Sequence, residues 1–172
     1  LEFIGENTTS EEECRHAKNE FKELIKELRA NQIRGTVSFD LSHIGMMISN
    51  SLAYSHLEEL AIAAQENNIQ LMISMEESGK VDNILSVYKD ISKLYSNVGI
   101  TLQVHLHRSL LDLKELLQMP GRIRLVKGAY QESEGIFIPR SEELNKRYIE
   151  FVGYCMEKNI RFLLQVMMKT YS

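Results

Sequence analysis

Several short apolar runs of this chain end in polar or charged residues, and one of them reads RLVKGAY at residues 124–130. A buried strand that finishes on Lys127 needs an explanation. The lysine either lies at the surface just past the sheet or is a cation that meets a ligand. A lysine at such a strand end can also form a Schiff base with a carbonyl substrate, and that chemistry stays open here.

The ends of the other apolar runs carry polar residues and residues of both charges. They are Glu6, Asp40, Ser42, His43, Ser74, Glu76, Glu77, Gln103, His105, His107, Arg108 and Gln165, besides Arg124, Lys127 and Tyr130. Because the carboxyl ends of parallel strands meet at one end of a barrel, we expect these side chains to line a common site. The set suits a ligand that carries phosphates and a heteroaromatic ring.

Two pairs within this set have simpler interpretations. His105 and His107 are two residues apart on an expected strand and would share a face, as in some metal sites, but no third and fourth ligand is evident, so we expect structural or surface histidines and no metal. Glu76 and Glu77 would point to opposite faces of a strand, so at most one of them lines the site.

The elements that must position these residues alternate between two patterns. Apolar runs predict strands at Leu1–Ile4, Thr36–Leu41, Gln70–Met75, Ile100–Leu106, Ile123–Val126 and Arg161–Val166. Helical periodicity predicts helices at Ser10–Leu28, His56–Glu66, Val81–Tyr95, Leu110–Leu117 and Ser141–Lys158. The acidic residues that follow Ser10 have the form of a capping box. Strand–helix alternation predicts a parallel sheet with crossover helices.

The regular spacing favours a (βα)8-type TIM barrel over a doubly wound sheet. Consecutive strands start between 23 and 38 residues apart. The first strand is followed by a single glycine, Gly5, so the glycine-rich loop of a dinucleotide-binding sheet is absent. We expect residues 1–172 to form one domain, an incomplete α/β barrel of about six parallel strands and five crossover helices.

Composition excludes several classes of function. The net charge of −4 gives no electrostatic argument for nucleic acid binding. Cys14 and Cys155 follow no metal or redox spacing, which favours a cytoplasmic protein. No apolar run approaches the length of a membrane span, so we expect at most peripheral contact with the inner face of the membrane.

Several stretches together resemble the flavin-dependent proline dehydrogenases. RLVKGAY at 124–130 is similar to that family's signature, and LQVHLHRS at 102–109 resembles its Q-A-Y-x-x-R-S strand. SMEES at 74–78 resembles its D-M-E-E, VSFDLSHIG at 37–45 its V-S-x-K-L-S/T strand, and LEFIGEN at 1–7 its first barrel strand. These stretches occur in the family's order over nearly the whole chain.

The resemblance implies an enzyme that holds FAD non-covalently in a distorted (βα)8 barrel. The family oxidises L-proline to Δ1-pyrroline-5-carboxylate, in proline catabolism, and passes the electrons to a quinone-type or other acceptor. By the same resemblance, Arg124 corresponds to the arginine beside the flavin N5, Gln103 to a glutamine that bonds the isoalloxazine, and Tyr130 to a tyrosine at the proline pocket. Lys127, Gly128 and Ala129 correspond to the segment that lines the flavin.

The chain departs from the family pattern at particular positions. Asp40 stands where the family has a lysine, and Ser74 stands where it has an aspartate. Leu144 and Asn145 stand where many members carry Thr and Asp. The alternatives to an active enzyme are a catalytically inactive barrel fragment and a repurposed interaction module.

The last residues also differ from the family pattern. The family's sixth strand usually ends in A-T-H-D or A-T-H-N, whereas this chain reads QVMMKTYS at 165–172. Because methionine has one codon, the coding DNA contains ATG-ATG, and a two-base shift lets it read His-Asp. We therefore hypothesise a frameshift that makes Val166–Ser172 an out-of-frame tail. An open barrel would expose its edges, and we expect self-association through them.

Overall fold

Five parallel strands form one sheet in a computed structural model of the chain, which describes residues 6–158 and the backbone of residues 162–165. The strands follow each other in chain order: β1 (Thr36–Phe39), β2 (Gln70–Ile73), β3 (Val98–Gln103), β4 (Ile123–Val126) and β5 (Phe162–Gln165). The expected strand Leu1–Ile4 and the proposed tail 166–172 lie outside the described residues, so both remain predictions.

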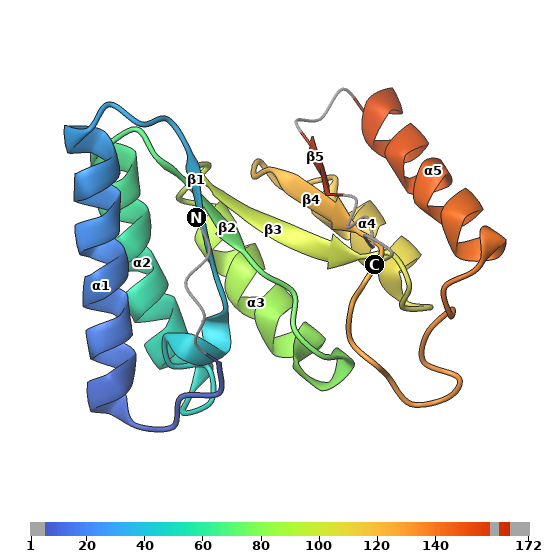
Figure 1. Ribbon diagram of the computed structural model, residues 1–172, viewed down its shortest axis with the longest axis horizontal. Coiled ribbons are helices and arrows are strands. Elements are labelled where there is room, and N and C mark those ends of the chain that lie inside the picture. The colour runs from blue at the N-terminus through green and yellow to red at the C-terminus, as the bar shows by residue number, and fades with distance from the viewer. Residues whose placement is uncertain (1–5, 159–161, 166–172) are drawn as a thin grey trace, which may run out of the picture.

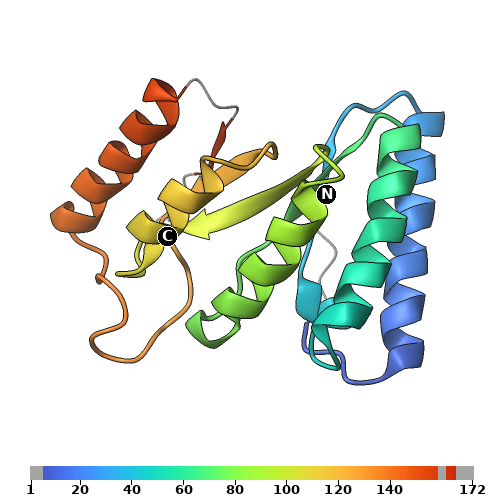
Figure 2. The same ribbon diagram turned by 180° about the vertical axis from the view of Figure 1, so that it is seen from behind.

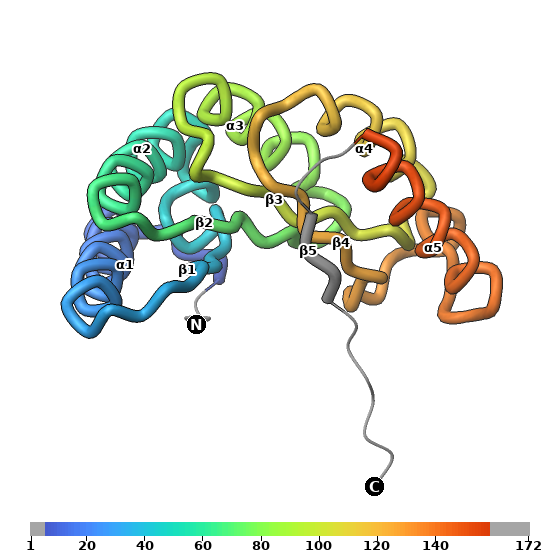
Figure 3. The backbone as a smooth tube through the Cα atoms, turned by 90° about the horizontal axis from the view of Figure 1, so that it is seen from above, coloured from blue at the N-terminus to red at the C-terminus, as the bar shows by residue number. Residues whose placement is uncertain are grey.

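Five helices accompany these strands and lie along the convex side of the curved sheet (Figure 1, Figure 3). They are α1 (Glu11–Ala30), α2 (Asn50–Glu66), α3 (Val81–Ser92), α4 (Ser109–Leu116) and α5 (Glu142–Glu157). Figure 2 shows the same arrangement from behind. Sequential strand order with the helices on one face is the arrangement of a (βα)8 barrel, so the prediction of an incomplete α/β barrel is confirmed.

Serine caps explain where three helices begin. Ser10 accepts the N–H of Glu13 at the start of α1, which confirms the serine half of the predicted capping box. Ser49 accepts the N–H of Leu52 at 3.1 Å, and Ser141 accepts the N–H of Leu144 at 3.2 Å. The Ser49 cap starts α2 six residues before the predicted start at His56. The apolar periodicity on which the prediction rests is weak in the first turns of the helix.

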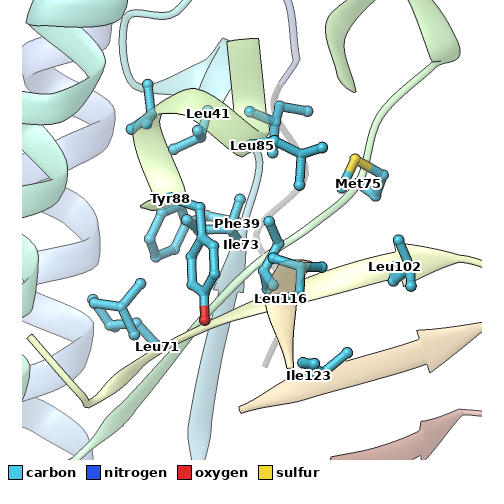
Figure 4. Packing of buried hydrophobic residues seen from close by; sticks show 14 of the residues in the cluster. Phe39, Leu41, Leu71, Ile73, Met75, Leu85, Tyr88, Leu102, Leu116 and Ile123 are labelled. Atoms are coloured by element: carbon cyan, nitrogen blue, oxygen red, sulfur yellow. The ribbon is translucent and has the colours of Figure 1, made fainter. Parts of the chain in front are cut away.

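The hydrophobic core lies between the sheet and the helices. Alternate residues of β1 to β4 point into it, among them Phe39 on β1, Ile73 on β2, Leu102 on β3 and Ile123 on β4 (Figure 4). Tyr88 of α3 packs among them. Because side chains alternate along a strand, the residues between these face the opposite side, which we call the inner face.

The strands β1, β2 and β3 end earlier than the sequence predicts, whereas β4 spans Ile123–Val126 as predicted. The expected strand Ile100–Leu106 is wrong at both ends, since β3 begins at Val98 and ends at Gln103. The chain then turns, so His105 and His107 do not share a strand face as predicted. None of the helices in the described part of the chain has the length and apolar character needed to cross a membrane.

Candidate functional site

Arg124 of β4 extends across the inner face and bonds to hydroxyls from three other segments. Its Nε donates to Oγ1 of Thr101 on β3 at 2.9 Å, and its Nη1 donates to Oγ of Ser38 on β1 at 3.0 Å. Its Nη2 donates to Oγ of Ser74, just past β2, at 3.4 Å. The strand alternation that sends Ile123 and Leu125 into the core sends Arg124 to the inner face. A half-buried guanidinium is therefore held in one orientation across the sheet.

Gln103 ends β3 on the same face, and both the nitrogen and the oxygen of its side-chain amide have partners. Its Nε2 donates to the backbone carbonyls of Met75 and Glu76, both at 2.9 Å. Its Oε1 lies 2.8 Å from Nε2 of His105. Gln103 thus joins the segments that follow β2 and β3, and its orientation is fixed before any ligand arrives.

Lys127 points away from the inner face. Its Nζ donates to Oδ1 of Asn145 on α5 at 2.6 Å and lies 6.0 Å from the ring centre of Tyr148. Position 127 has the same strand parity as Ile123 and Leu125, which explains this direction. In this conformation the ammonium is placed for α5, whereas Gly128 and Ala129 follow it as the small residues of the predicted flavin segment.

Tyr130 lies half-buried at the carboxyl end of the sheet among acidic residues. Burial raises the pKa of its phenol, and nearby negative charges raise it further. Those charges belong to Glu6, Asp40, Glu76 and Glu77. The structure therefore gathers acidic residues from the N-terminal segment and the ends of β1 and β2 around a phenol that stays protonated and can donate a hydrogen bond.

Glu76 and Glu77 contact the same cation, which corrects the expectation that they point to opposite faces of a strand. β2 ends at Ile73, so neither residue lies in it. Lys80 places its Nζ 2.6 Å from Glu76 and 2.8 Å from Glu77. Glu76 is 1% exposed and also accepts the N–H of Ser42 at 3.1 Å. Burial lowers the pKa of Lys80, but the two carboxylates raise it by more.

Glu132 fastens the loop 127–141 to the segment that follows β2. Its two carboxylate oxygens accept the backbone N–H of Ser78 at 2.8 Å and the Ser78 hydroxyl at 2.5 Å. The same loop pairs with the turn after β3, where His107 N–H donates to the Ile136 carbonyl at 3.1 Å. The segment that carries Tyr130 is therefore held from two sides.

Sequence reasoning missed several of these residues. Ser38 and Thr101 stood in strands interpreted as continuous apolar runs, yet each is a polar residue between two apolar ones, and this alternation was the available signal. Nothing in the local sequence marks Lys80 or Glu132, because their partners are brought close only by the fold.

The other residues predicted for the site either lie away from the inner face or are not described by the structure. His43 packs edge-on against Phe21 of α1, with ring centres 5.9 Å apart. Arg108 pairs with Asp112 at 2.8 Å, on the helix side. His107 is exposed. The side chain of Gln165 is not among the described ones. Within residues 6–158, no group of three or more metal-ligating side chains comes together.

Comparison with known proteins identifies the family to which this sequence is similar. The family model described as proline dehydrogenase matches residues 1–166. Proline dehydrogenase 1 of Bacillus subtilis subsp. natto is 30% identical over 139 residues, which cover 81% of this chain and 46% of that protein. Proline dehydrogenase 2 of Bacillus subtilis (strain 168) is 28% identical over 152 residues, which cover 88% of this chain and 50% of that protein. The chain thus spans about half the length of these curated relatives.

Solved structures support the fold. The crystal structure of proline utilization A (PutA) from Bdellovibrio bacteriovorus, inactivated by N-propargylglycine, superposes with a TM-score of 0.84 at 21% identity, over 95% of this chain and 22% of that one. Proline utilization A from Corynebacterium freiburgense gives a TM-score of 0.79 at 16% identity over 98% of this chain and 21% of that one. Because the family model matches residues 1–166, nearly the whole of this chain, the chain belongs to the proline dehydrogenase family.

Proposed function

We propose that this chain forms the flavin-binding part of a proline dehydrogenase, which oxidises L-proline to Δ1-pyrroline-5-carboxylate in proline catabolism. The observation that carries the proposal is Arg124. Its guanidinium spans the inner face, held by the hydroxyls of Ser38, Ser74 and Thr101, in a chain of this family. A preorganised cation at this place stabilises negative charge that develops on a ligand as it is reduced.

The residues present fit FAD. Arg124 offers a fixed positive charge, and Gly128 adopts φ +112°, a backbone conformation that residues with a side chain rarely adopt, so the predicted flavin segment passes the site as bare backbone there. When bound, FAD would supply the oxidising chemistry by accepting the two electrons that leave the substrate. We assign cofactor contacts to Gln103, Arg124, and the backbone of Lys127, Gly128 and Ala129.

Tyr130 is the residue we assign to the substrate side of the site. Its phenol stays protonated beside the carboxylates of Glu6 and Asp40, so it can donate a hydrogen bond, and its ring can pack against the apolar ring methylenes of the zwitterionic L-proline. With Arg124 on the cofactor side, Tyr130 completes the pair of residues to which we assign the reaction. The electron acceptor would be a quinone or a similar compound.

The location and assembly of the protein follow as parts of the same proposal. We expect a cytoplasmic protein, with at most peripheral contact with the inner face of the membrane, where a quinone would be reached. We also propose self-association through exposed sheet edges, because an unpaired strand edge is a template for pairing with another chain. Light scattering at micromolar concentration tests this, and a strictly monomeric species would contradict it.

A non-catalytic barrel is the second candidate, and two residues favour it. Asp40 adds a carboxylate near Tyr130 where the family has a lysine, and Ser74 offers Arg124 a hydroxyl where the family has an aspartate. Both changes alter the charge around the proposed substrate and cofactor.

The decisive experiment is the response of the bound flavin to proline. The purified chain is loaded with FAD and mixed anaerobically with L-proline. The proposal predicts that the visible flavin absorbance bleaches, and that D40K/S74D, which restores the family residues, bleaches faster. Flavin uptake with no bleaching in either protein would support the non-catalytic candidate. A chain that takes up no FAD would refute the proposal.

A further inference from the structure

His105 lies at the point where the segments around the predicted flavin site converge. It follows β3, and its side chain is buried. Its backbone N–H donates to the Lys127 carbonyl at 2.9 Å, and its carbonyl accepts the N–H of Ile138 at 2.8 Å. The residue is thereby fixed between the end of β4 and the far part of the loop 127–141.

Gln103 determines which nitrogen of the His105 ring carries the proton. Both N–H groups of the Gln103 amide are directed to carbonyls, those of Met75 and Glu76. Its Oε1 is therefore the atom that faces His105, at 2.8 Å from Nε2, and an oxygen there can only accept. His105 must donate from Nε2, which leaves Nδ1 without a proton in the neutral ring.

The other side of the ring lies against Gly128. A Cβ at position 128 would come within 2.4 Å of Cε1 and Nδ1 of His105, and Gly128 has φ +112°. Phe137 closes the remaining side, with its ring centre 5.6 Å from that of His105 in an edge contact. The imidazole thus occupies the space that a side chain at 128 would need, and it defines the path of the backbone there.

We propose that His105 is a positioning residue of the flavin site: its neutral imidazole fixes the amide of Gln103 and the course of residues 127–129. The inference rests on the proposed function for the identity of the cofactor. It extends that function to a residue outside the assigned contacts, since His105 acts through Gln103 and Gly128.

The electrostatic surroundings of the ring agree with a neutral state at pH 7. Burial lowers the pKa of His105 from its ordinary value. The negative charge of Glu132 on the loop 127–141 raises that pKa, and the positive charge of Arg140 before α5 lowers it. The net shift is downward, so the ring keeps one proton, and Gln103 holds it on Nε2.

The first arm of the test needs no flavin. In the wild-type chain labelled with ¹⁵N-histidine, the ring signals of His105 should report a neutral Nε2–H tautomer at pH 7. In Gln103→Leu that tautomer preference should disappear. An Nδ1–H tautomer or a charged ring in the wild-type chain would overturn the proposal.

The second arm compares ring variants. His105→Phe keeps an aromatic ring without the N–H, whereas His105→Gln keeps a donor near the position of Nε2. Loss of this one contact should weaken FAD binding about tenfold in H105F, with most of the affinity restored in H105Q. The control is H107F at the exposed neighbouring histidine, which should bind as the wild type does. Equal affinity in H105F and the wild type would overturn the proposal.

The backbone near Gly128 separates this proposal from the proposed function. In H105F, but not in H107F, the amide signals of Gly128 and Ala129 should shift without any flavin present. If the wild-type chain takes up no FAD, the proposed function fails. The placement of the segment by His105 is then decided by these amide signals alone, and signals that do not move in H105F refute it.

Discussion

Replacing Lys80 with methionine should destabilise the protein more than the loss of a surface ion pair would. The Lys80 side chain is 12% exposed, and its Nζ lies 2.6 Å from the carboxylate of Glu76 and 2.5 Å from Oδ1 of Asn7. Glu76 is 1% exposed, whereas the side chain of the second carboxylate partner, Glu77, is 43% exposed. Lys80 and Glu76 are therefore the buried pair at the carboxyl end of the sheet.

The size of the effect follows from which group is left unpaired. Lys80→Met leaves the buried carboxylate of Glu76 with the N–H of Ser42 but no cation. Removing one member of a buried pair costs about 3–5 kcal/mol, and we expect the lower end because Glu76 keeps its bond from the Ser42 N–H. Glu76→Gln leaves Lys80 with Glu77 and should cost about 1–2 kcal/mol. In the double variant neither charge is stranded, so the costs should fall short of additivity by about 2 kcal/mol.

Urea unfolding followed by far-UV circular dichroism measures these free energies. The control is Lys89→Met, which removes a more exposed pair with Glu115 and should cost less than about 1 kcal/mol. The reasoning is refuted if K80M lies within about 1 kcal/mol of the wild type, or if the E76Q and K80M costs simply add.

Three further outcomes follow from the same contacts. Gly128→Ala combines a strained φ with a clash against the His105 ring, and it should lower the free energy of unfolding in urea by about 3 kcal/mol. The control is Gly153→Ala on α5, which should be neutral or stabilising because a Cβ there meets nothing within 4 Å. Ser49→Ala removes the cap of α2 and should lower the free energy of unfolding by about 1 kcal/mol; an unchanged urea midpoint would contradict that role. Burial lowers the pKa values of His43 and His105, so the unfolded chain binds their protons more readily. Their contribution to stability should be complete above pH 6.5, the ordinary histidine pKa, and should be lost as the pH falls below it, in a pH series that H43F/H105F flattens.

The order of elements could be predicted from the sequence because strand and helix periodicities are local. The run around Ile123 and the stripe of α1 each identify their element without knowledge of the rest. Boundaries were less predictable, since β3 ends at Gln103 although apolar residues continue to Leu106. After Gln103 the backbone turns, and His105 bonds to Lys127, just past β4, and to Ile138 in the loop 127–141.

The candidate site could be predicted in location but not in its contacts. Strand-end reasoning grouped Arg124 with Tyr130; in the fold Arg124 extends from β4 across the inner face, and Tyr130 lies at the carboxyl end of the sheet. The direction of Lys127 follows from strand parity, which the sequence already contained. The pairing of Lys80 with Glu76, and the bond from Ser78 to Glu132 over 54 positions, depend on how loops meet in three dimensions.

The central claim is that Arg124 on the inner face holds a flavin. A titration of the chain with FAD, followed by the visible circular dichroism of the bound cofactor, tests it most directly when wild type and Arg124→Met are compared. Loss of one charge-assisted contact, worth about 1.5–3 kcal/mol, predicts saturable binding by the wild type and an affinity about 10 to 150 times weaker in the variant. Equal affinities in the two proteins, or no saturable binding by the wild type, would contradict the account.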